Sequence, residues 1–406
     1  MKIRMPAGAR AVISSLQARG YEAYAVGGCV RDSVLSREPD DWDITTSASP
    51  SEVKEVFTRT VDTGLQHGTV TVLMGKDQYE VTTYRIDGEY EDGRHPKEVI
   101  FTASLKEDLK RRDFTINAMA YNEDEGLVDL FGGMSDLQRK LVRCVGEPTE
   151  RFSEDALRIL RAVRFSAQLG FGIHSDTADA VRKLAPTLSK ISAERIAAEL
   201  TKLLISPRPE YLYRAYELGI TRVVLPEFDR MMEQQTGEAA LHAAKRVRPV
   251  RALRFAAVLY PAGEQAAVSL LRRLKFDNDT IRTAARIIRH MDRQLCEDPA
   301  AVRHAVYEVG EDIFPLLLEV RSAYADEKTS QQIRRVQECY ETICREGQCV
   351  SLKTLAVTGR DLIRLGCRPG PALGELLEAA LHEVLDDPKK NTKEYLEAFA
   401  KGHLGI

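Results

Sequence analysis

Two carboxylates separated by one residue, Asp41 and Asp43, follow shortly after a glycine pair at Gly27 and Gly28. The β-branched residues after Asp43 predict a strand over residues 43–46. Alternate side chains of a strand project from one face, so the two carboxylates should point the same way, about 7 Å apart. Such a pair repels itself unless a cation lies between its members, and oxygen-only ligands suit Mg²⁺. The alternative is a solvated acidic turn before an edge strand.

Two further features would suit phosphate groups. Glycine lacks a Cβ, so the Gly27-Gly28 pair lets the backbone approach a phosphate closely. The run Lys110-Arg111-Arg112 ends a short helix predicted to begin after Ser104. Arginine can bond two phosphate oxygens with its planar fork, although three cations also suit the negative end of a helix.

A helix predicted over residues 154–169 carries Asp155, Arg158, Arg161 and Arg164. The three-residue spacing brings the arginines close together on one side. An accepting Asp155 and a donating Arg158 would match a base edge that offers an amino group beside a ring acceptor, as cytosine and adenine do. Uracil and guanine would present a carbonyl to the carboxylate. The alternative is a Glu154–Arg158 pair on a solvated face.

Strand and helix patterns alternate up to about Val145, which predicts a mixed α/β domain, and from Pro148 onward the pattern is helical. Before the aspartate pair, a helix over residues 7–19 and a strand over 22–26 lead into the glycine pair. Glu80 lies in a predicted strand over residues 79–84. A polar loop over residues 86–97 joins this strand to the next and exceeds usual hairpin lengths, which often indicates function.

Composition sets the remaining bounds. The chain has 406 residues, a formal net charge of −3 and 44% hydrophobic residues, as expected of a soluble protein with two or more domains. We expect no signal peptide and no membrane span. Seven scattered cysteines suit a reducing cytoplasm. Any nucleic-acid site must be a local basic patch, and five cations lie in an acid-free stretch between Glu238 and Glu264: Lys245, Arg246, Arg248, Arg251 and Arg254.

The ordered set of motifs resembles the bacterial tRNA nucleotidyltransferases, or CCA-adding enzymes, of the class II group that includes bacterial poly(A) polymerases. The matching segments are Gly27–Asp32, Asp41–Asp43, Arg111–Asp113 and Glu154–Arg158. Glu194-Arg195 with Glu199-Leu200 resembles the family motif that braces the nucleotide-reading helix.

The resemblance implies an α+β protein whose mixed-sheet nucleotidyltransferase head is followed by an all-α neck, body and tail. The expected ranges are a catalytic head over residues 1–146, a nucleotide-recognising neck over 147–205, a body over 206–330 and a tRNA-binding tail over 331–406. It further implies that C, C and A are added to the 3′ end of tRNA from CTP and ATP, without a template and with release of pyrophosphate.

By position, the resemblance assigns Mg²⁺ binding to Asp41 and Asp43, with Glu80 completing the acidic cluster. The residues expected to hold the nucleotide are Gly28, Arg31, Arg112, Asp155, Arg158, Arg161 and Arg164.

Alternatives within the family are an enzyme restricted to A-addition or CC-addition and a poly(A) polymerase. A more distant one is an inactive RNA-binding protein, against which the intact Asp41 and Asp43 argue. CC-adding relatives have a shortened polar loop, so residues 86–97 favour full CCA or A-only addition. The sequence does not indicate an oligomeric state.

Overall fold

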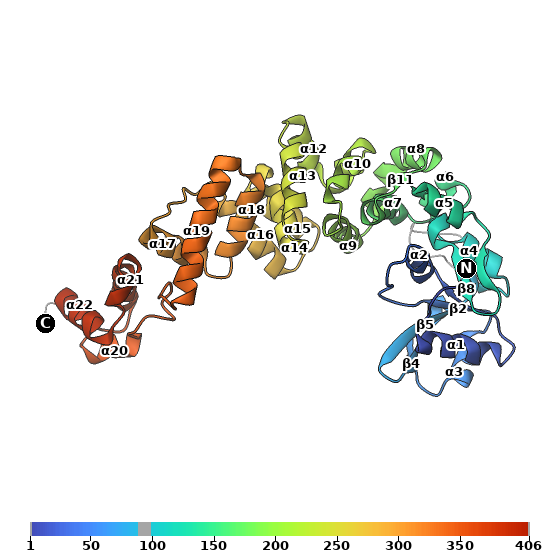
Figure 1. Cartoon of the computed structure of the whole chain (residues 1–406), viewed down its shortest axis with the longest axis horizontal. Helices are drawn as coiled ribbons and strands as arrows, with labels where there is room; N and C mark the ends of the chain where they lie inside the picture. The colour runs from blue at the N-terminus through green and yellow to red at the C-terminus, as the bar shows by residue number, and fades with distance from the viewer. Residues whose placement is uncertain (1, 88–98, 405–406) are drawn as a thin grey trace. The chain divides into compact units, whose positions relative to one another are not determined.

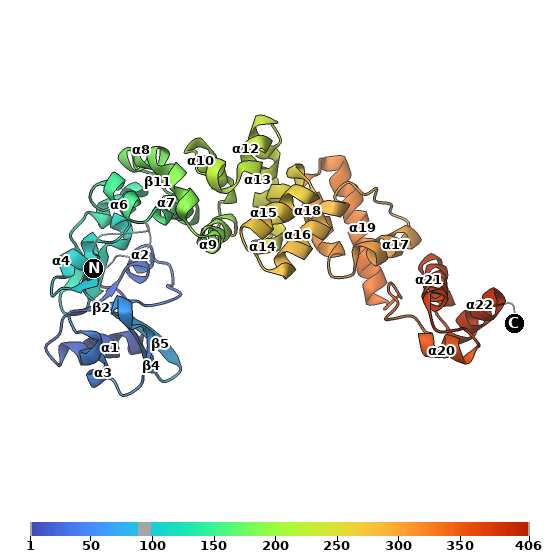
Figure 2. The ribbon, with the colours of Figure 1, turned by 180° about the vertical axis from the view of Figure 1, so that it is seen from behind.

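The computed structural model describes residues 2–87 and 99–404 of the chain. It divides into two compact units, Met1–Pro226 and Glu227–Ile406 (Figure 1; Figure 2). All the carboxylate, glycine and arginine motifs of the predicted site belong to the first unit. Most of the predicted polar loop, residues 88–98, lies outside the described residues.

A mixed sheet forms the base of the first unit, as the sequence predicted. Its seven strands are arranged in the order β3-β4-β5-β2-β1-β8-β9, with β2 and β5 parallel and the other neighbours antiparallel. The first unit also contains two small two-stranded sheets, β6-β7 and β10-β11. The strands are β1 Ala23–Val26, β2 Ile44–Thr46, β3 Thr60–Gly64, β4 Thr69–Met74, β5 Asp77–Thr83, β6 Arg85–Asp87, β7 Val99–Phe101, β8 Met119–Asn122, β9 Gly126–Asp129, β10 Leu141–Val142 and β11 Gly172–Ile173.

Helices pack against the sheet and continue beyond it. Local signals start several of them: Ser49 forms a capping box with Glu52, and the Ser104 side chain accepts from the Glu107 amide. Helices α1 and α3 contact each other and the sheet (dark blue in Figure 1). The helices of this unit are α1 Ala7–Gln17, α2 Gly28–Val34, α3 Pro50–Val56, α4 Leu105–Lys110, α5 Gly133–Arg139, α6 Pro148–Glu154, α7 Leu157–Leu169, α8 Ser175–Leu184, α9 Ala193–Leu204, α10 Leu212–Glu217 and α11 Thr221–Val224.

Two predicted elements differ from the structure in ways that affect the site. Strand β2 begins at Ile44, so Asp41 and Asp43 lie in the segment before it and not on the strand. The helix predicted over residues 154–169 is interrupted, because Asp155 is extended with φ −139° and ψ 102° and separates α6 from α7. The Oδ1 atom of Asp155 accepts a hydrogen bond from the backbone N–H of Leu157, and such a local bond competes with helix formation.

Helices make up the described part of the second unit, in agreement with the predicted all-α half. Asp277, Asp298 and Asp326 each cap one of them with a side-chain oxygen. They are α13 Gly237–Arg246, α14 Arg251–Leu259, α15 Glu264–Arg273, α16 Asn278–His290, α17 Pro299–Val309, α18 Phe314–Tyr324, α19 Glu327–Arg345, α20 Gly359–Arg364, α21 Pro371–Asp386 and α22 Lys393–Leu404, preceded by α12 Pro226–Glu233 at the boundary. Among the described helices, none is both long and apolar enough to cross a membrane.

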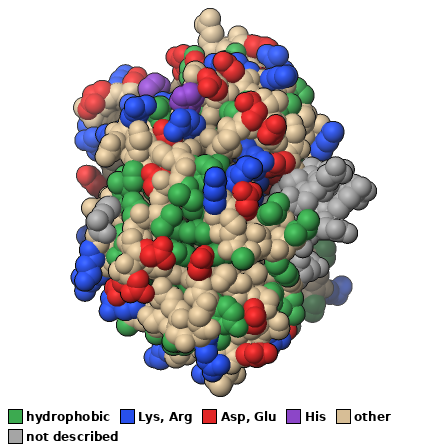
Figure 3. Space-filling model, turned by 90° about the vertical axis from the view of Figure 1, so that its right-hand side faces the viewer, with side chains coloured by type: hydrophobic (Ala, Val, Ile, Leu, Met, Phe, Trp, Pro, Cys, Tyr) green, Lys and Arg blue, Asp and Glu red, His purple; other side chains and the backbone are tan. Residues whose placement is uncertain are grey.

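The cations of the predicted basic patch have protein partners. Arg248 pairs with Glu319 at 2.7 Å, Arg251 pairs with Asp277, and Arg254 is buried. Acidic and basic side chains are likewise interspersed over the face drawn in Figure 3. Exposed pairs of this kind contribute about 0–1 kcal/mol, so an RNA phosphate could replace the carboxylate at little cost.

The close approach of α5 to the turn Thr115–Asn117 generates a stability prediction. A Cβ added at Gly133 would lie 2.4 Å from the backbone oxygen of Thr115, which cannot move without shifting the turn. Gly133→Ala should therefore destabilise the first unit by about 1–3 kcal/mol. Gly172→Ala is the control, because its nearest neighbour would be a flexible Leu141 methyl at 3.4 Å. Equal melting temperatures for the two variants would contradict this account.

Candidate active site

The three predicted acidic residues lie at one end of the β2–β5 pair. Val81 of β5 is the partner of Ile44 on β2, so Glu80 lies beside Asp43 across the two strands. Asp41 and Glu80 are exposed and Asp43 is partly buried. The structure therefore brings the acidic residues together, although the two aspartates precede the strand instead of lying on it.

The carboxylates of this group repel one another. Burial raises the pKa of Asp43 to about 6, the Asp41 carboxylate raises it as well, Arg112 opposes the shift and Glu80 adds to it. The described residues contain no cluster of three or more His, Cys, Asp or Glu side chains already converged on one point. Even so, the donors are carboxylate oxygens that repel one another, which is the chemistry that a hard divalent cation satisfies.

A cleft of about 1220 Å³ opens beside Asp41. Its lining includes Trp42, the cations Arg37 and Lys76, and Gln78 at the start of β5. The exposed carboxylate of Asp41 can therefore be reached by a large molecule as well as by solvent.

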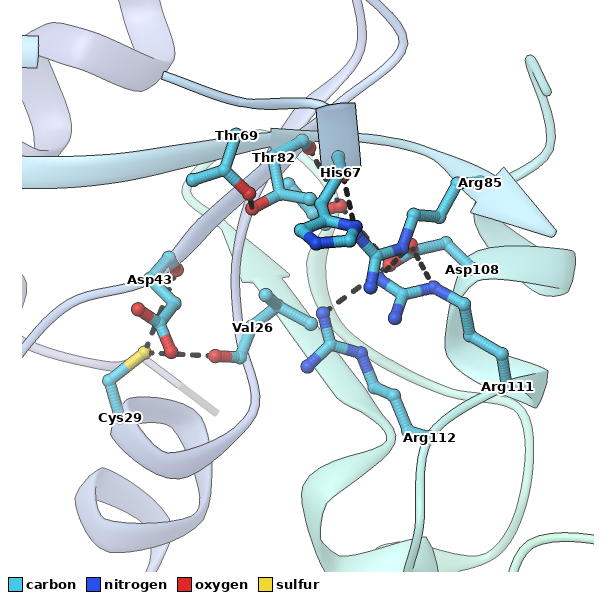
Figure 4. A network of polar contacts seen from close by, with 11 residues as sticks. Val26, Cys29, Asp43, His67, Thr69, Thr82, Arg85, Asp108, Arg111 and Arg112 are labelled. Carbon is cyan, nitrogen blue, oxygen red and sulfur yellow. Dashed lines mark hydrogen bonds and ion pairs between the residues drawn. The ribbon is translucent and has the colours of Figure 1, made fainter. Parts of the chain in front are cut away.

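The glycine pair has a steric role that falls mainly on Gly27. Its φ of +81° favours glycine, and a Cβ there would lie 3.1 Å from the NH1 atom of Arg112. Gly28 begins α2, and a Cβ there would lie 3.8 Å from its nearest neighbour, NH2 of Arg31. The turn thus keeps the Arg112 guanidinium close to the backbone, on the side of the site where Asp43 also lies (Figure 4).

Arg31 is held by a chain of buried polar contacts. Its NH1 donates to Asn117 at 2.6 Å, and its other nitrogens donate to Asp32. Asn117 in turn donates to Asp113 at 3.1 Å. Asp113 also accepts from Nε of Arg161 at 2.7 Å, so these contacts connect α2 with α7. Burial alone would raise the pKa of Asp113, but Arg161 and Asn117 hold it at about 2, and the carboxylate is ionised.

Three guanidinium groups converge on the ring of Phe165 on α7. The Cζ atoms of Arg31, Arg161 and Arg164 lie 5.1, 5.3 and 3.7 Å from the ring centroid. Arg164 also pairs with Glu199 of α9 at 2.6 Å, yet burial lowers its pKa to about 10. Each of the three arginines is paired with a carboxylate, so the region between α2 and α7 is a network of ion pairs.

Asp155 and Arg158 lie close together in sequence but bind different protein groups. Asp155 accepts from NH2 of Arg195 on α9 at 2.7 Å. Arg158 donates to Glu154 at 2.6 Å and to the backbone oxygens of Arg151 and Arg111. The expected bracing of this segment by Arg195 and Glu199 is thus present in the structure. The Glu154–Arg158 ion pair of the alternative interpretation is also present in the structure.

Sequence reasoning missed three residues that organise the site: Asp108, Asn117 and Phe165. Asp108 could have been found from its spacing, since residues three and four apart meet on a helix surface and Arg111 and Arg112 follow at those distances. Asn117 and Phe165 each have a partner four residues away, Asp113 and Arg161, but their contacts with Arg31 join distant segments that the sequence does not reveal.

The position of Gly27 against Arg112 predicts the effect of a single methyl group. Gly27→Ala should strain the backbone by about 1–2 kcal/mol and displace the guanidinium, weakening binding of a nucleoside triphosphate. Gly20→Ala is a matched control, since Gly20 has φ +88° but open space around it. Equal loss of nucleotide affinity in both variants, measured by calorimetry, would mean that strain and not the displaced arginine is responsible.

Comparison with known families agrees with this geometry. Residues 23–143 match the family model described as "Poly A polymerase head domain", residues 170–232 match "Probable RNA and SrmB- binding site of polymerase A", and residues 250–400 match a model of domain 2 of tRNA nucleotidyltransferases. The first match contains the segments Gly27–Asp32, Asp41–Asp43 and Arg111–Asp113, and the second contains Glu194-Arg195 with Glu199-Leu200.

Full-length relatives give the same assignment. The chain is 39% identical to the CCA-adding enzyme of Levilactobacillus brevis, with 96% of each chain covered. It is 38% identical to that of Enterococcus faecalis, covering 96% of this chain and 94% of the other. A crystal structure of the Bacillus stearothermophilus CCA-adding enzyme in complex with CTP is 33% identical, with a TM-score of 0.81 and coverage of 98% and 97%. The chain therefore belongs to the family of the CCA-adding enzymes.

Proposed function

We propose that this protein adds C, C and A to the 3′ end of tRNA from CTP and ATP, without a nucleic-acid template. The observation that carries the proposal is the placement of the Asp41, Asp43 and Glu80 carboxylates beside Arg112 and the Gly27 turn. The names of the relatives favour CCA addition over the restricted or poly(A)-forming alternatives.

In the proposed reaction the 3′-hydroxyl oxygen of the tRNA bonds to the α-phosphorus of the nucleotide. The bond from that phosphorus to the bridging oxygen breaks, pyrophosphate leaves, and the hydroxyl proton passes to water. The protein contributes positioning and charge rather than a covalent nucleophile. Arg31 and Arg112 hold the triphosphate, with the Gly27-Gly28 turn allowing close approach.

Asp41 and Asp43, with Glu80 beside them, are the proposed Mg²⁺ ligands. Burial raises the pKa of Asp43, and the Asp41 and Glu80 carboxylates raise it further; this mutual repulsion of carboxylates supports the assignment, because a hard divalent cation relieves it. Bound Mg²⁺ would favour ionisation of the attacking hydroxyl and offset the charge that develops on the leaving pyrophosphate.

Asp155 and Arg158 are proposed to read the base. Arg195 fixes one oxygen of Asp155, and Glu154 fixes one nitrogen of Arg158, so both side chains are oriented before the nucleotide arrives. Arg161 contributes charge near the nucleotide, and Arg164, held by Glu199, supports it. We place the reaction in the cytoplasm, since the seven cysteines are free.

The test of the function uses tRNAs that end at the discriminator base, after the first C or after the second C. Each is incubated with labelled CTP, ATP, UTP or GTP, and products are resolved one nucleotide at a time. We expect C, then C, then A, with no extension beyond. Incorporation of A alone would favour the A-only alternative, two C's alone the CC-only one, and long A tracts poly(A) synthesis.

The metal assignment predicts a thermal as well as a catalytic effect. Mg²⁺ should raise the melting temperature of the unmodified protein, and Asp43→Asn should abolish both this rise and nucleotide transfer while tRNA binding is retained. Asp77→Asn, which removes an exposed carboxylate from β5, serves as the control. Substantial Mg²⁺-dependent transfer by Asp43→Asn or Asp41→Ala would contradict the assignment.

The base-reading assignment predicts a loss of selectivity. Asp155→Ala should reduce the ratio of kcat/KM for CTP over UTP, because the carboxylate that repels the uracil carbonyl is gone. Sites built on buried polar groups reject wrong substrates by up to ~10⁴–10⁵. Arg195→Ala should reduce the ratio less, and Arg182→Ala, which removes an exposed arginine of α8, should leave it unchanged. An unchanged ratio in Asp155→Ala would place the base-reading residue elsewhere.

A further inference from the structure

A wholly buried carboxylate, Asp108 of α4, lies behind the proposed triphosphate site (Figure 4). Its Oδ1 accepts from Nε and NH2 of Arg111 at 3.0 and 2.7 Å. Its Oδ2 accepts from NH2 of Arg112 at 3.3 Å and from the hydroxyl of Thr45 at 3.1 Å. Burial raises the pKa of Asp108, but Arg112, Arg111 and the Thr45 hydroxyl bring it below its ordinary value, so the group is ionised.

Arg112 lies between two acidic groups. One terminal nitrogen of Arg112 donates to Asp108, and the other lies close to the Gly27 turn. The positive charge of Arg112 also opposes the rise in the pKa of Asp43. The Nε atom is buried and has no hydrogen-bond partner among the described residues. A free arginine side chain populates many rotamers, and a fixed partner removes much of this freedom before a ligand binds.

Thr45 connects the same carboxylate to the strand that follows the metal ligands. It lies two residues after Asp43 on β2, and its hydroxyl also lies 3.3 Å from the Thr82 carbonyl of β5. Asp108 therefore has partners on both sides of the site: the arginines after α4 and the strand that begins next to Asp43.

The simplest alternative is that these are ordinary pairs at helical spacing. In the other pairs at this spacing that the structure describes, the acidic side chain keeps some exposure, from 11% for Glu227 and 23% for Glu154 to 79% for Asp279. Asp108 is instead 0% exposed, and taking a charge out of water is costly unless it is fully paired. A helix does not need this arrangement for stability, whereas a site that must hold a guanidinium in one direction does.

We propose that Asp108 is a positioning residue for the triphosphate, which fixes the guanidinium of Arg112 against the Gly27 turn before the nucleotide binds. The inference rests on the proposed function, in which Arg112 binds the triphosphate. In the absence of Asp108, Asp43 is the carboxylate that acts on Arg112, so the arginine would turn toward the proposed metal ligands.

The first test compares affinity for CTP and CMP in the full chain without tRNA, by calorimetry. Asp108→Asn should lower the CTP-to-CMP affinity ratio about tenfold, because Arg112 loses the charged partner that holds its guanidinium. Glu107→Gln, which removes the neighbouring and less buried carboxylate of α4, should leave the ratio unchanged. A structural role alone would weaken CTP and CMP equally, and that result overturns the inference.

The second test asks whether Asp108 acts through Arg112. Adding Asp108→Asn to Arg112→Ala should cause no further loss of CTP affinity, whereas full additivity overturns the inference. If Asp108→Asn does not fold, Thr45→Val removes one donor with little change of shape and should lower the ratio about threefold. An unchanged ratio in Thr45→Val then overturns it. If the unmodified chain binds CTP and the variants have an unchanged CTP-to-CMP affinity ratio, this inference alone is refuted. If the unmodified chain does not bind CTP, the proposed function is refuted as well.

Discussion

The ion pair between Arg161 and Asp113 joins helix α7 to the turn that precedes β8, with a nitrogen-to-oxygen distance of 2.6 Å. Asp113 also binds Asn117, and Asn117 binds Arg31, so one buried carboxylate orients arginines from two segments. Breaking a buried pair costs more than forming it gains, because the remaining charge is left without water or partner. The site therefore depends on this carboxylate for the direction of its positive charge.

The same constraint explains the partners of α7. Arg31, Arg161 and Arg164 share the ring of Phe165, and their mutual repulsion requires counter-charges nearby. Asp32, Asp113 and Glu199 supply these from α2, the turn before β8 and α9. Because these segments are far apart in sequence, this network of ion pairs forms only when the sheet and the helices after it are packed together. The geometry of the proposed site and the folding of the first unit are thus coupled.

Sequence patterns predicted the elements well wherever the signal was local. The helix over residues 7–19, the strand over residues 22–26 and the helix after Ser104 follow from neighbouring residues, and the structure has them as α1, β1 and α4. The strand order and the identities of Asn117 and Phe165 as organising residues required non-local contacts that one sequence does not reveal. The charge run around Arg248 shows the same limit, since its partner Glu319 is 71 residues away.

The interruption at Asp155 places the Asp155 carboxylate outside the helix that carries the arginines of α7, whereas a continuous helix would carry both. In an unbroken helix, a change of register before Arg158 would rotate every arginine of α7 around the axis, by about 100° per residue from the 3.6-residue repeat. Here Asp155 is extended and α7 begins only at Leu157, so the position of the Asp155 carboxylate is set by backbone torsions outside α7. Insertion or deletion in this short connection would change the distance between acceptor and donor while leaving the arginine face of α7 in place. Under the proposed function, the connection is therefore the part of the chain at which preference among bases can diverge without rebuilding the proposed triphosphate site.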